Sequence, residues 1–215
     1  MSQKSLALII CALSVSITAL AGDHESAGYP CPLDKTLNCV MSGLDNPRGL
    51  AFGPEGALYV AEAGHGAGAV TDPANDPGCF LIGPSVGCYG PTGAISRLWR
   101  GEQERFATGL PSYAAPGKGN RAIGPADIAF TGRGHAFVTI GLEGDPRART
   151  QFPTVPQLSN FASLAHVSAS GEWHLVADVG QYQIDNNAAE TDPYGILAEP
   201  AIQRIERMGG HLPAR

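Results

Sequence analysis

One segment of this chain occurs twice and begins a third time, which constrains the fold more than any single motif. The first copy, GLDNPRGLAFGPEGALYVAEAG, runs from Gly43 to Gly64, and the second, IGPADIAFTGRGHAFVTIG, from Ile123 to Gly141. The third begins at Asp192 as DPYGILA and then diverges. A repeated segment of this kind indicates a supersecondary unit that stacks in series.

Each copy predicts a β-hairpin. Two short runs that contain β-branched or aromatic residues flank a Gly-rich turn in both copies. A second hairpin follows each copy after a long insertion, because alternation with a period of two recurs around Trp99 and Trp173. The predicted strands are, in order, 48–52, 57–62, 93–99, 102–108, 127–131, 135–140, 161–168 and 172–178.

Four antiparallel strands per unit predict an all-β fold. Four-stranded units in series with Gly-rich turns are typical of β-propeller blades. We therefore expect a partial β-propeller over residues 43–200, with about two blades and the first strand of a third. A two-sheet sandwich remains the alternative. Residues 22–42 are expected to form an N-terminal segment and residues 201–215 a divergent tail.

A family resemblance lies in the same residues. The segments NPRGLAFGPEGALYVAEAG, GPTGAI, GPADIAF, VTIGLEGDP and DPYGILA resemble the ScyD/ScyE family in order and spacing, from about Gly43 to Ala198. That family is named after proteins encoded with the machinery for scytonemin, and its role is poorly defined. The resemblance implies an NHL-like or SMP-30-like propeller with six blades, in an exported bacterial protein. Because further blades would be expected after Ala198, we expect a truncated or frame-shifted chain.

The N-terminus predicts export. Lys4 precedes an apolar stretch from Leu6 to Leu20, and Ala19-Leu20-Ala21 forms a small-x-small cleavage site. Residues 1–21 are therefore expected to be a signal peptide, with the mature chain beginning near Gly22. The predicted location is secreted or periplasmic.

Four cysteines remain after that cleavage, and their spacing favours local disulfides. Cys31 with Cys39 and Cys79 with Cys88 are the expected pairs, although four cysteines allow three pairings. A zinc site is the rival interpretation, but the close pairs of cysteines that it requires are absent from the sequence.

The charge of the chain argues against nucleic acid as a partner. The formal net charge is −6 and the 14 Lys and Arg residues are scattered, whereas phosphate binding needs clustered basic residues. No apolar run after the signal is long enough to span a membrane. The expected partner is an unidentified small molecule or protein, and open strand edges could also allow self-association.

Propeller geometry places the candidate binding residues. The connections 63–92, 109–124, 141–161 and 179–192 should all open at one end of the blades, where a central channel has its mouth. The candidates for ligand binding there are Arg48, Glu62, Asp127 and Tyr194. The alternative is that Asp127 and Arg48 hold blade turns or pair across neighbouring blades.

The sequence does not predict catalytic residues or a cofactor. The segment Asp185-Asn186-Asn187, with Glu190 and Asp192, is rich in oxygen ligands for calcium but lacks EF-hand spacing. The six histidines are dispersed in the sequence without a metal-binding pattern. We expect a non-enzymatic binding or scaffolding module. The alternatives are an SMP-30-like metal-dependent hydrolase or lactonase with Glu62 and Asp127 as ligands, and a fragment without function.

Overall fold

The computed structural model describes residues 38–82, 85–131, 134–150 and 155–186, which fold into two antiparallel sheets. Sheet 1 contains β1 (Pro47–Phe52), β2 (Leu58–Glu62), β3 (Cys79–Ile82), β4 (Ser85–Trp99) and β5 (Glu102–Ala114). Sheet 2 contains β6 (Pro125–Thr131), β7 (His135–Ile140), β8 (Ser163–Val167) and β9 (Trp173–Asp178) in that order. The all-β class is confirmed, and each predicted strand overlaps an observed one.

Sheet 1 repeats the four-strand order of sheet 2 and adds β3. β2 pairs with β1 and with the second half of β4, and β5 pairs along the other side of β4. β3 pairs with the first four residues of β4. Both sheets are therefore antiparallel meanders of hairpin, connection and hairpin.

The connection 63–92 is more ordered than a long loop, because it holds β3 and the first half of β4. Cys79 and Cys88 lie directly opposite each other in these strands and form the predicted disulfide. Cys31 lies outside the described residues, so its pairing with Cys39 stays a prediction.

The other connections also contain secondary structure that the sequence pattern did not indicate. Residues 141–161 contain two 3₁₀ helices, η1 (Pro146–Thr150) and η2 (Pro156–Asn160). The short helix α1 (Val179–Asp185) follows β9, and the side chain of Asp178 caps it by accepting a hydrogen bond from the backbone N–H of Gln181 at 2.7 Å. Seven residues are too few to show a helical period, and so this helix was not predicted. In the described part of the chain, no helix has the length and apolar character needed to cross a membrane.

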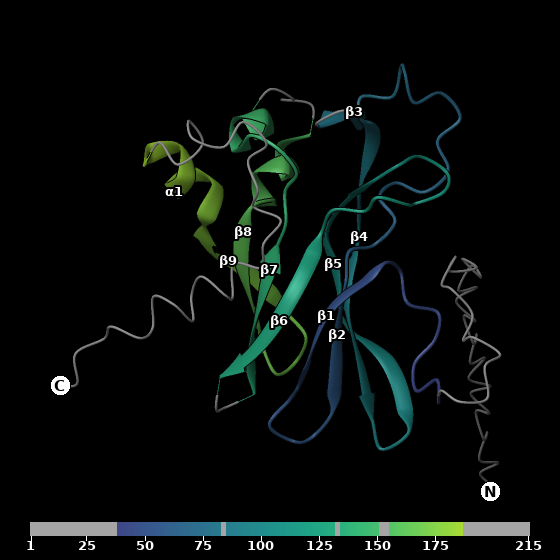
Figure 1. The fold of residues 1–215 in the computed structure, drawn as a ribbon, viewed down its shortest axis with the longest axis vertical. Helices are drawn as coiled ribbons and strands as arrows, with labels where there is room; N and C mark the ends of the chain where they lie inside the picture. The colour runs from purple at the N-terminus through teal and green to yellow at the C-terminus, as the bar shows by residue number, and fades with distance from the viewer. Residues whose placement is uncertain (1–37, 83–84, 132–133, 151–154, 187–215) are drawn as a thin grey trace, which may run out of the picture.

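The connections and the hairpin turns lie at opposite ends of the sheets (Figure 1). The turns that join β1 to β2, β4 to β5 and β8 to β9 gather at the lower end in Figure 1, which we call the turn end. β3, the 3₁₀ helices and α1 gather at the upper end, which we call the loop end. The predicted grouping of the long connections at one end is thus visible in the described residues.

The hydrophobic core lies between the two sheets. The ring of Tyr59 in sheet 1 is 4.6 Å from the ring of Phe130 in sheet 2 and 5.3 Å from that of Phe106. Buried side chains from both sheets continue this core: Ala61, Ile95, Ala107, Ile128, Val138, Ala165 and Val167. Their burial removes apolar surface from water, which is the main force that holds the sheets together.

The backbones of the two sheets approach each other closely where β1 meets β6. A Cβ atom placed on Gly49 would lie 2.0 Å from Oδ1 of Asp127 and 2.8 Å from its Cα. Only a residue without a side chain fits there. The glycine of the first repeat therefore allows β6 to pack on β1.

Gly49→Ala should lower the free energy of unfolding by about 1–3 kcal/mol, because the added methyl group forces β1 and β6 apart. Gly141→Ala is the control, since its nearest neighbour would be 3.7 Å from the new Cβ. Urea denaturation measures the free energy of unfolding of both variants. Equal stability of the two variants would contradict this account of the junction.

Candidate functional site

A cavity of about 620 Å³ lies at the loop end, where the two sheets meet. Its wall comes from residues 48–49 and 63 of the first repeat and from residues 121–127, 139–143, 162–163 and 179. The volume falls in the range of small-molecule sites, about 300–1,000 Å³. The cavity lies at the end of the sheets where the sequence placed the long connections (Figure 1).

Arg48 contributes a cationic group to this wall from the start of β1. Its Nη2 donates a hydrogen bond to the backbone carbonyl of Ala122 at 2.8 Å, which holds the side chain across the junction of the two repeats. A guanidinium group has five N–H donors. This bond therefore leaves Arg48 able to bind an anion in a defined position.

Asp127 and Thr139 face each other across β6 and β7 on the opposite wall. Oδ1 of Asp127 accepts a hydrogen bond from the backbone N–H of Ile128 at 2.9 Å, which fixes the carboxylate. The other carboxylate oxygen of Asp127, Oδ2, takes no part in that bond. Asp127 therefore supplies a hydrogen-bond acceptor from β6.

Thr139 is the unusual member of this wall. Only 4% of its surface is exposed, and its hydroxyl has no hydrogen-bond partner among the residues that the structure describes. A buried hydroxyl without a partner costs roughly 1–3 kcal/mol. Sequence reasoning missed this residue, since a threonine in a strand gives no signal of its own.

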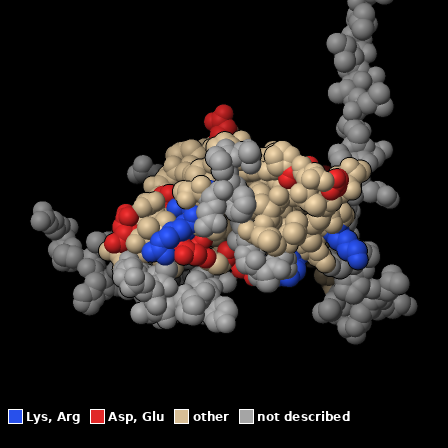
Figure 2. Space-filling model, turned by 90° about the horizontal axis from the view of Figure 1, so that it is seen from above, with Lys and Arg blue, Asp and Glu red and all other residues tan. Residues whose placement is uncertain are grey.

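The rest of the lining is largely apolar. Ile123, Ile140 and Leu142 lie on it, and Arg121 and Glu143 form an ion pair of 3.8 Å that also contributes to the wall. Seen from above, most of the described surface carries no charged side chain, and the basic and acidic groups form small neighbouring clusters (Figure 2). The arrangement can hold a compact molecule with an apolar body and a few polar groups.

Glu62 lies away from this cavity, in a buried polar cluster on the opposite face of sheet 1. Its carboxylate is fully buried and accepts hydrogen bonds from the backbone N–H of Asp45 at 2.5 Å and from the hydroxyl of Ser96 at 2.5 Å. Nη2 of Arg105 lies 3.2 Å from the same carboxylate. Both oxygens of Glu62 are thus occupied by structural partners.

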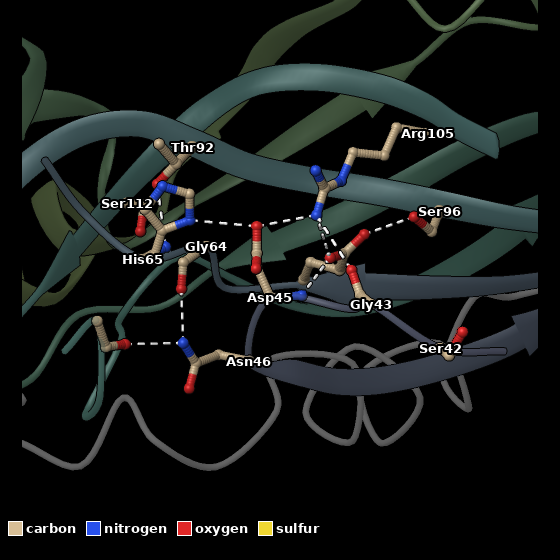
Figure 3. Close-up of polar contacts among 12 residues, drawn as sticks. Ser42, Gly43, Asp45, Asn46, Gly64, His65, Thr92, Ser96, Arg105 and Ser112 are labelled. Atoms are coloured by element: carbon tan, nitrogen blue, oxygen red, sulfur yellow. Dashed lines mark hydrogen bonds and ion pairs between the residues drawn. The ribbon is translucent and has the colours of Figure 1, made fainter. Parts of the chain in front are cut away.

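Asp45 extends this cluster between Arg105 and His65 (Figure 3). Its Oδ2 lies 2.8 Å from Nη2 of Arg105 and 3.1 Å from Nδ1 of His65. Burial acts to lower the pKa of Arg105, but the hydrogen bonds and charges of Glu62 and Asp45 outweigh it and raise the pKa above its usual value. The cluster fixes the segment before β1 onto sheet 1.

The structure therefore brings together two of the four predicted site residues. Arg48 and Asp127 line one cavity, whereas Glu62 belongs to the structural cluster with Arg105. Tyr194 lies outside the described residues. So do Asn187, Glu190 and Asp192 of the possible calcium segment.

Arg149 is a second residue that the sequence did not single out. It is 7% exposed, and its guanidinium donates to the carbonyls of Pro146, Ser159 and Phe161 and to the carboxylate of Asp178. These bonds fasten the connection 141–161 to the start of β8 and the end of β9. Arg149 thereby supports the side of the cavity formed by residues 162–163 and 179.

Three histidines that are dispersed in the sequence meet on adjacent strands of sheet 2. Nδ1 of His135 and Nε2 of His166 are 2.8 Å apart, and the rings of His166 and His174 are 5.0 Å apart. Burial lowers the pKa of His166, and the charges of the two neighbouring histidines lower it further. Within residues 38–82, 85–131, 134–150 and 155–186, no group of three or more His, Cys, Asp or Glu side chains is arranged to hold a metal ion.

The chain matches no family model, no curated protein and no solved structure.

Replacement of the buried Glu62 should be costly. Glu62→Gln removes the charge that offsets Arg105 and turns an amide N–H₂ toward a group that donates, so the free energy of unfolding should fall by about 3 kcal/mol. Glu104→Gln is the control, because its ion pair with Arg97 is exposed and should contribute less than about 1 kcal/mol. Chemical denaturation compares the two. A small effect for Glu62 would contradict a structural role.

The histidine cluster should make stability depend on pH. The pKa of His166 is lower in the folded chain than its ordinary value of 6.5, so the unfolded chain binds more protons as the pH falls below 6.5. The free energy of unfolding should therefore decrease in that range and be fully restored above it. Denaturation measured above the titration range of carboxylates, which lies near pH 4, tests this. His166→Gln should flatten the dependence, and an unchanged slope would refute the assignment.

Proposed function

We propose that this protein is a non-enzymatic binding module with a propeller-type arrangement of blades, and that its ligand occupies the cavity at the loop end. The two four-stranded meanders, the repeated segments and the packing of β6 on β1 and β2 support successive blades. The proposal also takes the chain to be exported and related to ScyD/ScyE proteins, which rests on the N-terminal pattern and the quoted residues.

The observation that carries the proposal is the buried, unpartnered hydroxyl of Thr139, a residue that lines the cavity. An unfilled buried hydroxyl is unfavourable in the free protein and becomes favourable once a ligand donates or accepts a hydrogen bond there. Such groups are therefore found where a protein gives up stability for binding.

The chemistry of the wall points to a small hydroxycarboxylic acid. Arg48 provides a cation for a carboxylate, and Asp127 and Thr139 together can bind a ligand hydroxyl, one as acceptor and the other as donor or acceptor. The apolar side chains Ile123 and Ile140 suit a short hydrocarbon body. Binding without turnover requires only these groups.

Isothermal titration with 2-hydroxyisocaproate, with isocaproate as the matched acid without the hydroxyl, tests the proposal. The hydroxy acid should bind about tenfold more tightly, since one hydrogen bond contributes about 1–1.5 kcal/mol. Arg48→Gln should weaken both acids, and Thr139→Val should remove the preference between them. The acid should be recovered unchanged by mass spectrometry.

The same threonine variant should also stabilise the free protein. Thr139→Val replaces a buried unpaired hydroxyl with a methyl group and should raise the free energy of unfolding by about 1 kcal/mol. Thr92→Val is the control, because the hydroxyl of Thr92 accepts from His65 and donates to Gly66, both at 3.0 Å, and its loss should destabilise. Equal binding of both acids, or their conversion to product, would refute the proposal.

A further inference from the structure

The repeat allows the two sheets to be compared position by position. Leu50 and Phe52 in the first copy correspond to Ile128 and Phe130 in the second. Their cross-strand partners also correspond: Val60 and Leu58 in sheet 1, and Val138 and Ala136 in sheet 2. At these positions, the same face of each sheet is built from equivalent residues. Further along β2 the faces differ, because Glu62 stands where sheet 2 has Ile140 and is bonded to the segment before β1.

These equivalent faces have different surroundings. In sheet 2 the face packs on sheet 1, where Ile128 is 3% exposed and Phe130 contacts Tyr59. In sheet 1 the corresponding face points away from sheet 2, and Leu50 and Phe52 are 60% and 69% exposed. We call the patch of Leu50, Phe52 and the half-buried Leu58 the outer face of sheet 1.

The face of sheet 1 that packs against sheet 2 also has an equivalent in sheet 2. Phe130 packs on Tyr59, which pairs across strands with Arg97. The matching pair in sheet 2 is Phe137 and His166, whose rings are 5.4 Å apart on the side turned away from sheet 1. We call Phe137, His166 and the adjoining His135 and His174 the outer face of sheet 2. It lacks a described neighbouring sheet, whereas its counterpart on sheet 1 is covered.

We propose that the outer face of sheet 1 in one chain docks on the outer face of sheet 2 in a second copy of the chain. This contact would reproduce the part of the inter-sheet packing nearest the turn end, with Leu50 and Phe52 in the places of Ile128 and Phe130. The segment before β1 covers the rest of the face through Asp45 and Glu62. The two faces are different, so the association is head to tail. It differs from pairing through strand edges, because side chains rather than backbone groups make the contact.

A second copy suits these faces better than the third partial repeat, 192–198. The residues that follow it do not repeat the second-strand pattern that provides Ala136 and Val138. A second copy covers both faces with the same interface.

Native mass spectrometry of the full chain, with light scattering after gel filtration, tests the proposal. The wild type should form oligomers with increasing concentration. Leu50→Asp/Phe52→Asp should be monomeric, and so should His135→Asp/His174→Asp, whose changed side chains are exposed. Leu81→Asp is the control, since Leu81 is 57% exposed on β3, outside both faces, and should leave assembly intact. Circular dichroism confirms that each variant is folded.

A mixture of the two double variants distinguishes head-to-tail contact from other modes. Each variant keeps one intact face, so the mixture should form one-to-one dimers and nothing larger. A monomeric wild type, or a mixture that stays monomeric, would overturn the proposal. Assembly of the Ile196→Asp variant but not of the wild type would show that residues 192–198 occupy the face instead, and would overturn the proposal as well. None of these results depends on ligand binding in the cavity.

Discussion

The packing of β6 across β1 and β2 determines most of what this molecule can do. It buries the aromatic contact between Tyr59 and Phe130 and brings the backbone of β1 against Asp127, where only glycine fits. The same approach places Arg48 opposite Asp127 and Thr139 and so creates the cavity at the loop end. The fold and the candidate site therefore have one physical origin. A shift at this junction would change both.

The strands were predictable because their signals are local. Alternating apolar residues and Gly-rich turns lie within each hairpin, and both copies of the repeat show the same pattern. The first half of β4 was not predictable, because it is rich in glycine, which lowers strand propensity. The structure gives the reason: a Cβ on Gly87 would lie 2.5 Å from the ring of Tyr113, and one on Gly90 would lie 2.2 Å from the carbonyl of Gly66. Tertiary contacts required those glycines, and no local pattern shows that.

The candidate site was predictable only as far as topology determines it. Strand order was sufficient to put Arg48 and Asp127 at one end, since both stand at the start of an equivalent strand. Glu62 occupies the same end but points into a cluster with Ser96 and Arg105, because its side chain faces the other side of β2. Whether a carboxylate is already hydrogen-bonded or ion-paired within the fold depends on residues far apart in sequence. The sequence therefore predicted at which end of the sheets these residues lie, but not on which face of its sheet each side chain lies.

Glu62 and Thr139 are both buried polar groups, and they show opposite uses of burial. Glu62 has a hydrogen-bond or ionic partner for each oxygen, so its burial fixes the segment before β1 at little net cost. Thr139 has no described partner, so its burial leaves an unmet interaction at the cavity wall. The equivalent position in the first repeat is Ala61, which is fully buried in the core. Sheet 2 thus carries a hydroxyl beside the cavity where sheet 1 carries a methyl group in the core, and the proposed binding site rests on this difference between the two copies.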